Sequence, residues 1–260
     1  MDYQFLSMKQ DERILTISLN RPPTNPLSSE FGKELLKAFN EAAQMDDVTV
    51  VVITSSQEKA FIAGADIKEM VAMNLAESEA FSKLLQDANN TLAGMKKVVI
   101  AAINGHALGG GCELAMACDY RFMMAGKALI GLPEAGLGIV PGAGGTQRLP
   151  RLVGFSKAKD ILLCGKVMGP EDALAIGLID RIIDVENFMD EVMKFAGKLA
   201  SGAGKALGYI KVAVNEGFDL PMEQALAVER KYGLENLTTA DAKEGLTAFA
   251  EKRKPVFTCK

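Results

Sequence analysis

The stretch VVIAAINGHALGGGCELAMACD, residues 98–119, contains the change of pattern that decides the fold of this chain. Val98–Asn104 is rich in valine and isoleucine, which predicts a strand buried on both faces. Glycines end that strand, and a helix with apolar residues nearly all round follows from Gly110 to about Cys118. A buried strand that leads through glycines into a buried helix indicates an α/β core with parallel pairing.

The segments on either side continue this alternation of strands and helices. Gly202 and Gly204 lie in a run of small residues, which predicts a link between a mixed α/β core and a helical tail. Further strands are predicted over residues 12–20, 48–55, 120–124 and 181–183, and helices from Ser28 or Ser29 to about 45 and over 77–95, 145–154, 156–164, 170–176, 186–200, 205–216, 222–237 and 240–252.

The composition is that of an ordinary globular protein. The 260 residues are 48% hydrophobic and 24% charged, which excludes a disordered chain, a collagen and a coiled coil. The net charge of -4 argues against a dedicated nucleic-acid binder. No uncharged apolar run has the length of a membrane span, and the first residues lack the apolar core of a secretory signal.

Several common catalytic motifs are absent from the sequence. There is no P-loop, no GxGxxG fingerprint and no HExxH. The four cysteines form no CxxC pair and the chain has one histidine, His106, so we expect no Cys/His zinc site. A Ser-His-Asp triad would have to use His106, and no serine motif supports it.

Three glycine-rich segments remain as candidates for a site: KAFIAGADIKEM (59–70), INGHALGGGCELAMACD (103–119) and LPEAGLGIVPGAGGTQRLPR (132–151). Each also has a plain structural interpretation. The first would be a tight turn with Asp66 capping a helix, Glu113 would be an acid at the start of a surface helix, and Glu134 would cap a turn or face solvent. Burying a carboxylate is costly, however, and both glutamates stand among apolar residues and glycines.

Together the three segments predict one site. Two carboxylates on separate elements can flank a water and a carbon atom, and two glycine-rich turns can each offer an N–H group to one oxygen. The N–H groups of Gly110 and Gly111 would lie at a helix N-terminus, which favours negative charge. A general acid/base pair with an oxyanion hole suits chemistry that passes through an enolate.

At these residues the sequence resembles the crotonase (enoyl-CoA hydratase/isomerase) superfamily, and within it the short-chain enoyl-CoA hydratases. The resemblance covers essentially the whole chain, from ILTISLNRPPTNPLS (14–28) through the central segments to AFAEKRKP (248–255). It implies a spiral of stacked ββα units over residues 1–200, with the active site, followed by a helical trimerisation region over residues 201–260. It also implies trimers or dimers of trimers.

The resemblance further implies a role for each matching residue. Glu113 and Glu134 match the two catalytic glutamates of hydratases, and the N–H groups of Ala65 and Gly110 match the oxyanion hole. Gly142 matches a glycine whose backbone orients the second carboxylate. The residues expected along the substrate and its coenzyme A are Ala63, Ala65, Asp66, Ile67, Lys68 and Gly110, and the candidates for the CoA phosphates are Arg21, Lys59, Lys252, Arg253 and Lys254.

The activity so implied is the reversible syn addition of water to a trans-2-enoyl-CoA, giving a 3-hydroxyacyl-CoA in fatty-acid β-oxidation. Coenzyme A is part of the substrate, and no cofactor or metal is expected. Three alternatives stay open: another crotonase reaction such as isomerisation or hydration of a branched enoyl-CoA, an RNA-binding role, and an inactive acyl-CoA binder. We expect a cytoplasmic protein without nucleic-acid or membrane partners, although a mitochondrial matrix enzyme without its transit peptide would also fit.

Overall fold

The computed structural model describes residues 3–259, in which the chain winds between two sheets. The larger sheet has six strands in the order β1-β2-β3-β5-β7-β10, and only β1 and β2 pair antiparallel. Its strands are β1 (Leu6–Asp11), β2 (Ile14–Leu19), β3 (Val50–Ser55), β5 (Val98–Ile103), β7 (Tyr120–Met124) and β10 (Arg181–Ile183). The predicted strands in this sheet are confirmed, whereas β1, which is mostly exposed and polar, was not predicted.

The smaller sheet has four short strands in the order β4-β6-β8-β9. They are β4 (Ala60–Ala63), β6 (His106–Leu108), β8 (Ile130–Gly131) and β9 (Val167–Met168). Strands β4, β6 and β8 run parallel to one another, and β9 is antiparallel to β8. The sequence patterns did not reveal β6, β8 or β9.

The chain visits the two sheets alternately, which produces the predicted spiral. In one turn β3 of the large sheet is followed by β4 of the small sheet and then by helices; in the next, β5 is followed by β6 and α4 (Gly110–Ala117). A third turn runs from β7 to β8 and on to the short helix η1 (Pro133–Leu137) and α5 (Gly145–Val153). This is the ββα arrangement expected for the fold class.

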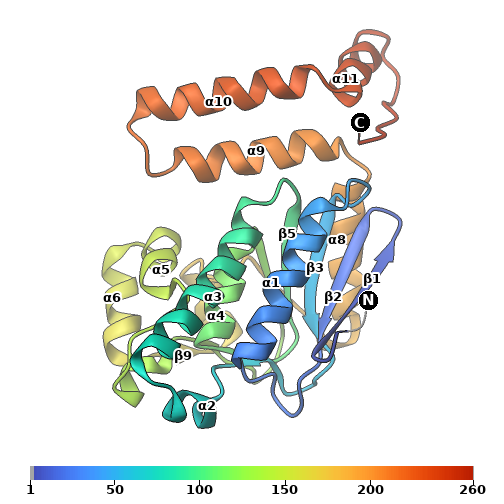
Figure 1. Cartoon of the computed structure of the whole chain (residues 1–260). Helices are drawn as coiled ribbons and strands as arrows, with labels where there is room; N and C mark the ends of the chain where they lie inside the picture. Colours follow the sequence, from blue (N-terminus) through green and yellow to red (C-terminus); the bar gives the residue numbers. More distant parts are fainter. Residues whose placement is uncertain (1–2, 260) are drawn as a thin grey trace.

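Helices cover both faces of the large sheet. On one face α1 (Ser29–Gln44) packs beside α3 (Leu75–Gly94), and both contribute phenylalanine and leucine side chains to the larger core cluster. The side chain of Ser28 caps α1, as predicted. On the other face α8 (Phe188–Ala200) packs against valines and isoleucines of β3 and β5 (Figure 1).

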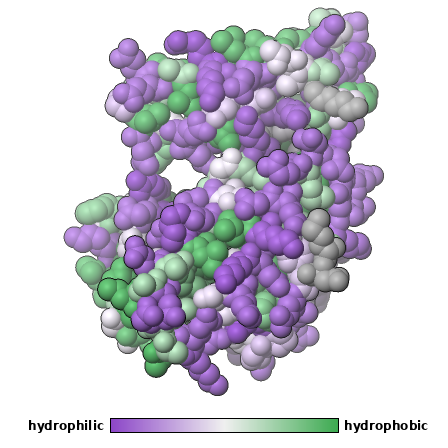
Figure 2. All heavy atoms as spheres, in the orientation of Figure 1, coloured by the Kyte–Doolittle hydropathy of each residue, from purple (hydrophilic) through white to green (hydrophobic). Residues whose placement is uncertain are grey.

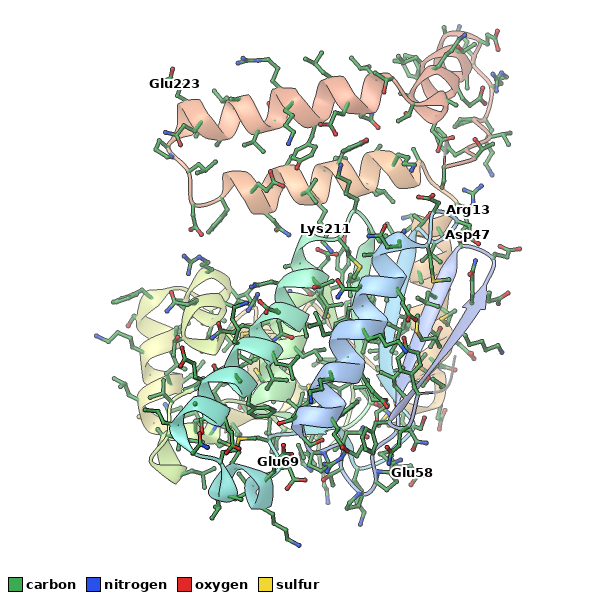
Figure 3. The ribbon with its side chains drawn as sticks, in the orientation of Figure 1. Arg13, Asp47, Glu58, Glu69, Lys211 and Glu223 are labelled. Carbon is green, nitrogen blue, oxygen red and sulfur yellow. The ribbon has the colours of Figure 1, made fainter. Side chains whose placement is uncertain are left out.

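Three helices near the C-terminus form a layer of their own beside the spiral, α9 (Gly204–Gly217), α10 (Met222–Leu237) and α11 (Ala240–Ala250) (Figure 1). The buried Lys211 of α9 points toward the core, where it donates hydrogen bonds to the Leu92 and Lys97 carbonyls and pairs with Asp119 at 2.9 Å (Figure 3). Between this layer and α5 lies a cavity of about 960 Å³ (Figure 2).

The remaining elements are short. They are α2 (Ile67–Ala72), α6 (Phe155–Cys164), α7 (Pro170–Ala175) and η2 (Val185–Asn187). Asp66 caps α2 by accepting a hydrogen bond from the Glu69 N–H, as its position in the sequence suggested. Within residues 3–259 no helix is long and apolar enough to cross a membrane.

Candidate active site

Three strands of the small sheet end at one edge, and the candidate site is built there. Ala63 of β4 pairs with Leu108 of β6, and Leu108 pairs with Gly131 of β8. Because these strands are parallel, the segments that follow them emerge side by side at their carboxyl ends. Ala65, Gly110 and Glu134 each stand two or three residues past a strand end, so the topology brings all three together.

The turns after β4 and β6 present two main-chain donors. Among the described residues, neither the Ala65 N–H nor the Gly110 N–H donates a hydrogen bond to another group. The two turns are in contact, since the Cα of Gly64 lies 3.7 Å from where a Cβ on Gly109 would stand. Gly110 also begins α4, so its N–H lies at the positive end of a helix.

These positions leave no room for larger residues. Gly109 has a positive φ of 53°, and a Cβ on Gly110 would lie 2.4 Å from Cδ1 of Leu27. The backbone conformation at Gly109 therefore favours glycine, and a side chain on Gly110 would have to displace the buried side chain of Leu27.

Glu113 lies in the first turn of α4 with only 2% of its surface exposed. Its Oε1 accepts two main-chain hydrogen bonds, from the Ala143 N–H at 2.8 Å and the Gly145 N–H at 2.7 Å. Burial raises the pKa of this carboxyl, while the two N–H donors and the nearby Arg148 oppose the rise. Both donors stabilise the ionised form of Glu113 and offset part of the rise in pKa that burial causes.

Glu134 lies in η1 and is also buried, with 8% of its surface exposed, but its surroundings differ. Its Oε2 is buried and has no hydrogen-bond partner in residues 3–259. Burial raises the pKa of Glu134 to about 7, and the negative charge of Glu113 adds to the rise. This carboxyl therefore holds a proton at a pH where an exposed glutamate would be ionised.

The two carboxyl groups lie against consecutive residues of one turn. Oε1 of Glu134 is 2.9 Å from the position of a Cβ on Gly109, and Oε2 of Glu113 is 3.9 Å from that on Gly110. A proton acceptor, a proton donor and two free N–H groups thus surround the same small volume. The arrangement can move a proton on and off adjacent atoms while it stabilises negative charge on an oxygen.

The structure differs from the sequence-based expectation for the glycine-rich loop Gly142–Gly145. That expectation placed the loop, and Gly142 in particular, behind Glu134. The loop donors that reach a carboxylate instead belong to Ala143 and Gly145, and they hold Glu113. Gly142 offers its carbonyl oxygen to α3 and has no contact of this kind with Glu134. The run of glycines signalled a backbone cradle, but not which of two glutamates it would hold.

The other residues expected along the substrate lie on or beside the first turn. Ala63 ends β4, Asp66 caps α2, and Ile67 and Lys68 are exposed at the start of that helix. They form a continuous rim from the two N–H donors outward to solvent.

Two of the basic candidates for the CoA phosphates are already engaged. Arg21 donates to the Asp66 carboxylate at 2.8 Å and to the Pro26 carbonyl at 2.6 Å. Arg253 pairs with Glu244 and Glu251. Lys59, Lys252 and Lys254 are exposed. The described residues contain no cluster of three or more metal-ligating side chains.

Comparison with known proteins agrees with the resemblance found in the sequence. The sequence profile described as enoyl-CoA hydratase/isomerase matches residues 9–260. A crotonyl-CoA hydratase from Syntrophomonas wolfei is 41% identical over the full length of both chains. A short-chain-enoyl-CoA hydratase from Clostridium acetobutylicum is 39% identical, with 98% of this chain and 97% of that protein covered.

Solved structures agree with the sequence comparison. An enoyl-CoA hydratase from Geobacillus kaustophilus superposes with a TM-score of 0.97 at 36% identity, covering 100% of this chain and 98% of the other. One from Bacillus anthracis has a TM-score of 0.93 at 35% identity, covering 99% and 100%. The profile match, the full-length relatives and the shared fold show that this chain belongs to the enoyl-CoA hydratase/isomerase family.

Proposed function

We propose that this protein is an enoyl-CoA hydratase, which adds water to a trans-2-enoyl-CoA and gives a 3-hydroxyacyl-CoA. The observation that carries the proposal is the pair of buried carboxyl groups with opposite surroundings, set against one turn. Glu113 accepts two N–H donors, whereas Glu134 has a buried oxygen without a partner. The names of the full-length relatives support the same activity.

In the proposed mechanism each group has one task. Glu113 takes a proton from water as the water oxygen forms a bond to C3, and the C2–C3 double bond breaks. The electron pair moves toward the thioester oxygen, where the N–H groups of Ala65 and Gly110 stabilise the enolate-like charge. Glu134 then gives its proton to C2. The reverse sequence of steps is the dehydration.

The remaining substrate contacts follow from this placement. Ala63, Asp66, Ile67 and Lys68 would line the coenzyme A side of the site, and Lys59, Lys252 and Lys254 are the exposed cations available to its phosphates. The mechanism uses no metal or redox cofactor, since both proton transfers and the charge stabilisation are assigned to the chain itself. We place the activity in fatty-acid metabolism in the cytoplasm, in keeping with the bacterial origin of several relatives.

The decisive assay follows the loss of enoyl-thioester absorbance with crotonyl-CoA. We expect wild-type turnover, and a 10²- to 10⁴-fold lower kcat in Glu113→Gln and in Glu134→Gln, because each removes a positioned proton-transfer group, which typically contributes about that factor. Glu79→Gln, an exposed residue of α3, serves as the control and should keep full activity. Unaltered turnover in either site variant would remove that glutamate from the mechanism.

The same assay separates the alternatives that the sequence left open. Enoyl-CoAs of different length and branching establish the substrate range. An isomerase would move the double bond without incorporating oxygen from labelled water, and an inactive binder would retain the acyl-CoA unchanged.

We also propose a trimer, alone or paired into a hexamer. The support is a set of large apolar side chains exposed on and between the C-terminal helices, three of which, Ile210, Val214 and Phe218, line the cavity between those helices and α5. The full set is Ile210, Val214, Phe218, Met222, Leu226, Leu234, Leu237, Leu246 and Phe249. Apolar surface on this scale is typical of interfaces. Light scattering should give three or six times the chain mass, and a single-chain mass would contradict the proposal.

A further inference from the structure

The 142–145 loop, which donates two hydrogen bonds to Glu113, itself accepts hydrogen bonds from side chains of α3. The Gly142 carbonyl accepts hydrogen bonds from Oγ of Ser82 at 2.6 Å and from Nε2 of Gln86 at 2.8 Å. The next carbonyl, that of Ala143, accepts from Nδ2 of the buried Asn89 at 3.0 Å. All three donors belong to α3, which contributes no atom to the proton-transfer pair.

The spacing of these donors matches the helix period. Residues 82, 86 and 89 stand at positions i, i+4 and i+7, so their side chains form a row along one face of α3. The row is polar although it lies beside Phe81 and Leu85, which pack in the core. A polar row that meets two successive carbonyls of another loop is a specific contact between these elements.

The amide between Gly142 and Ala143 connects the polar row of α3 to the carboxylate of Glu113. The Gly142 carbonyl and the Ala143 N–H belong to the same planar amide and point in opposite directions. Ser82 and Gln86 therefore fix one side of the amide whose other side donates to Oε1 of Glu113. Asn89 fixes the following amide, and the last donor, the Gly145 N–H, begins α5.

We infer that Ser82, Gln86 and Asn89 are positioning residues, which orient the 142–145 loop so that the Ala143 and Gly145 N–H groups converge on Glu113. The inference rests on the proposed function for its kinetic consequence. Hydrogen bonds in series also polarise one another, so the α3 donors strengthen the Ala143 N–H as a donor to the carboxylate.

Few charged or titratable groups face Glu113, so a change in its pKa can be assigned to the hydrogen bonds that a variant removes. Glu134 faces it from η1, Arg148 from α5 and the Cys112 thiol from α4 itself. Arg148 also donates to the Ala143 carbonyl at 3.2 Å and stays in place in every variant below. The three α3 residues are uncharged, so replacing them changes hydrogen bonds without changing the net charge of the site.

The test compares two variants with a matched control. The double variant Ser82→Ala/Gln86→Met removes both donors to Gly142 at partly exposed positions, where folding is expected to be retained. Asn89→Leu removes the donor to Ala143. Ser78→Ala, one turn earlier on α3, deletes a hydroxyl that bonds only within its own helix and should behave as wild type. Replacing Ser82→Ala by Ser82→Thr in the double variant keeps the hydroxyl and should restore part of the loss.

Two readouts are needed, one of them independent of activity. Infrared difference titration of the free protein, with Glu113→Gln as the reference, reports protonation of Glu113 directly. We expect its pKa to rise by about half a unit in the double variant, because a weakened donor stabilises the anion less. With crotonyl-CoA, kcat should fall about tenfold while KM changes less than about twofold, since misoriented groups lose rate rather than binding.

An unchanged Glu113 titration in the folded double variant would overturn the inference, even if Asn89→Leu fails to fold. A shifted titration in a protein that does not hydrate enoyl-CoA would uphold the positioning role and reject the proposed function instead. If the double variant loses activity while the pKa of Glu113 stays the same, the inference also fails, because a general loss of structure would lower activity in the same way.

Discussion

Glu113 and Glu134 are the same residue type and are both buried, yet the chain gives their carboxyl groups different hydrogen-bond surroundings. The difference is main-chain geometry: two N–H groups converge on Glu113, and none in the described chain reaches Oε2 of Glu134. The negative charge of Glu113 raises the pKa of Glu134, so we expect the two carboxyl groups to titrate together and, in the proposed mechanism, to carry a single proton. In the proposed mechanism, hydration leaves Glu134 deprotonated and Glu113 protonated, and dehydration restores the first arrangement.

This shared proton predicts the pH dependence. Above a pH of about 7 Glu134 loses the proton that it would give to C2, so kcat/KM for hydration should fall as the pH rises through that value. Water addition consumes no net proton, so the ratio of forward to reverse kcat/KM is independent of pH. The alkaline limbs measured with crotonyl-CoA and with 3-hydroxybutyryl-CoA should therefore coincide. A profile that stays flat from about pH 6 to 9 would show that the pair does not share a proton.

At the scale of elements, the site depends on α4 lying directly against β4. A Cβ on Gly111 would stand 2.3 Å from the carbonyl oxygen of Ile62, which is backbone and cannot move aside like a flexible side chain. The small residues at the start of α4 thus set the separation between the turn that carries Ala65 and the turn that carries Gly110.

Gly111→Ala should consequently force these elements apart. We expect the free energy of unfolding to fall by about 1–3 kcal/mol, the usual cost of overpacking, together with a loss of kcat. Chemical denaturation measures the first quantity. Gly94→Ala, at the end of α3 with open space around it, is the control and should leave stability unchanged or slightly raised. Equal stability of the two variants would contradict the close contact.

The elements also show how far the sequence could lead. Elements with a clear pattern, such as α1 with its apolar face and β3 with its continuous apolar run, lie where their patterns predicted them. The small sheet that positions the site was largely missed, because strands of two to four residues are too short to show an alternation and pair only with distant segments. Both glutamates were predicted from their motifs, whereas the supports from α3 depend on tertiary contacts that no local pattern encodes.

On the scale of the whole molecule, the C-terminal helices are attached to the spiral by an ion pair between the buried Lys211 and the partly exposed Asp119. Lys211 satisfies its three donors with two carbonyls and Asp119, whose Oδ2 also accepts the Val99 N–H at 2.7 Å. Burial lowers the pKa of Lys211 and raises that of Asp119, and each opposes the change in the other. The division of the chain at residue 200 remains a prediction; α8 ends at Ala200 and α9 begins at Gly204.

Removing the lysine should loosen this attachment. In Lys211→Met the Asp119 carboxylate loses its ion-pair partner. Breaking a fully buried pair from one side typically costs about 3–5 kcal/mol, and the partial exposure of Asp119 makes the expected loss smaller. We expect lower stability to denaturant and faster protease cleavage near residues 201–203. Lys198→Met, on the exposed side of α8, is the control. Adding Asp119→Asn should recover part of the loss; a double variant less stable than Lys211→Met would argue against the pair as the cause.

The two free N–H groups at Ala65 and Gly110 have a consequence for how such a protein changes over generations. A donor that belongs to the main chain is encoded by no particular codon, so most point mutations cannot delete it while the turn survives. In the proposed mechanism the contact with the thioester oxygen is therefore inherited with the fold, whereas each carboxylate can be lost by one nucleotide change. New reactions on the same scaffold are then expected to arise by exchange of acids around a constant anchor, and replacing either amide by an ester through chemical ligation is the direct way to probe that anchor.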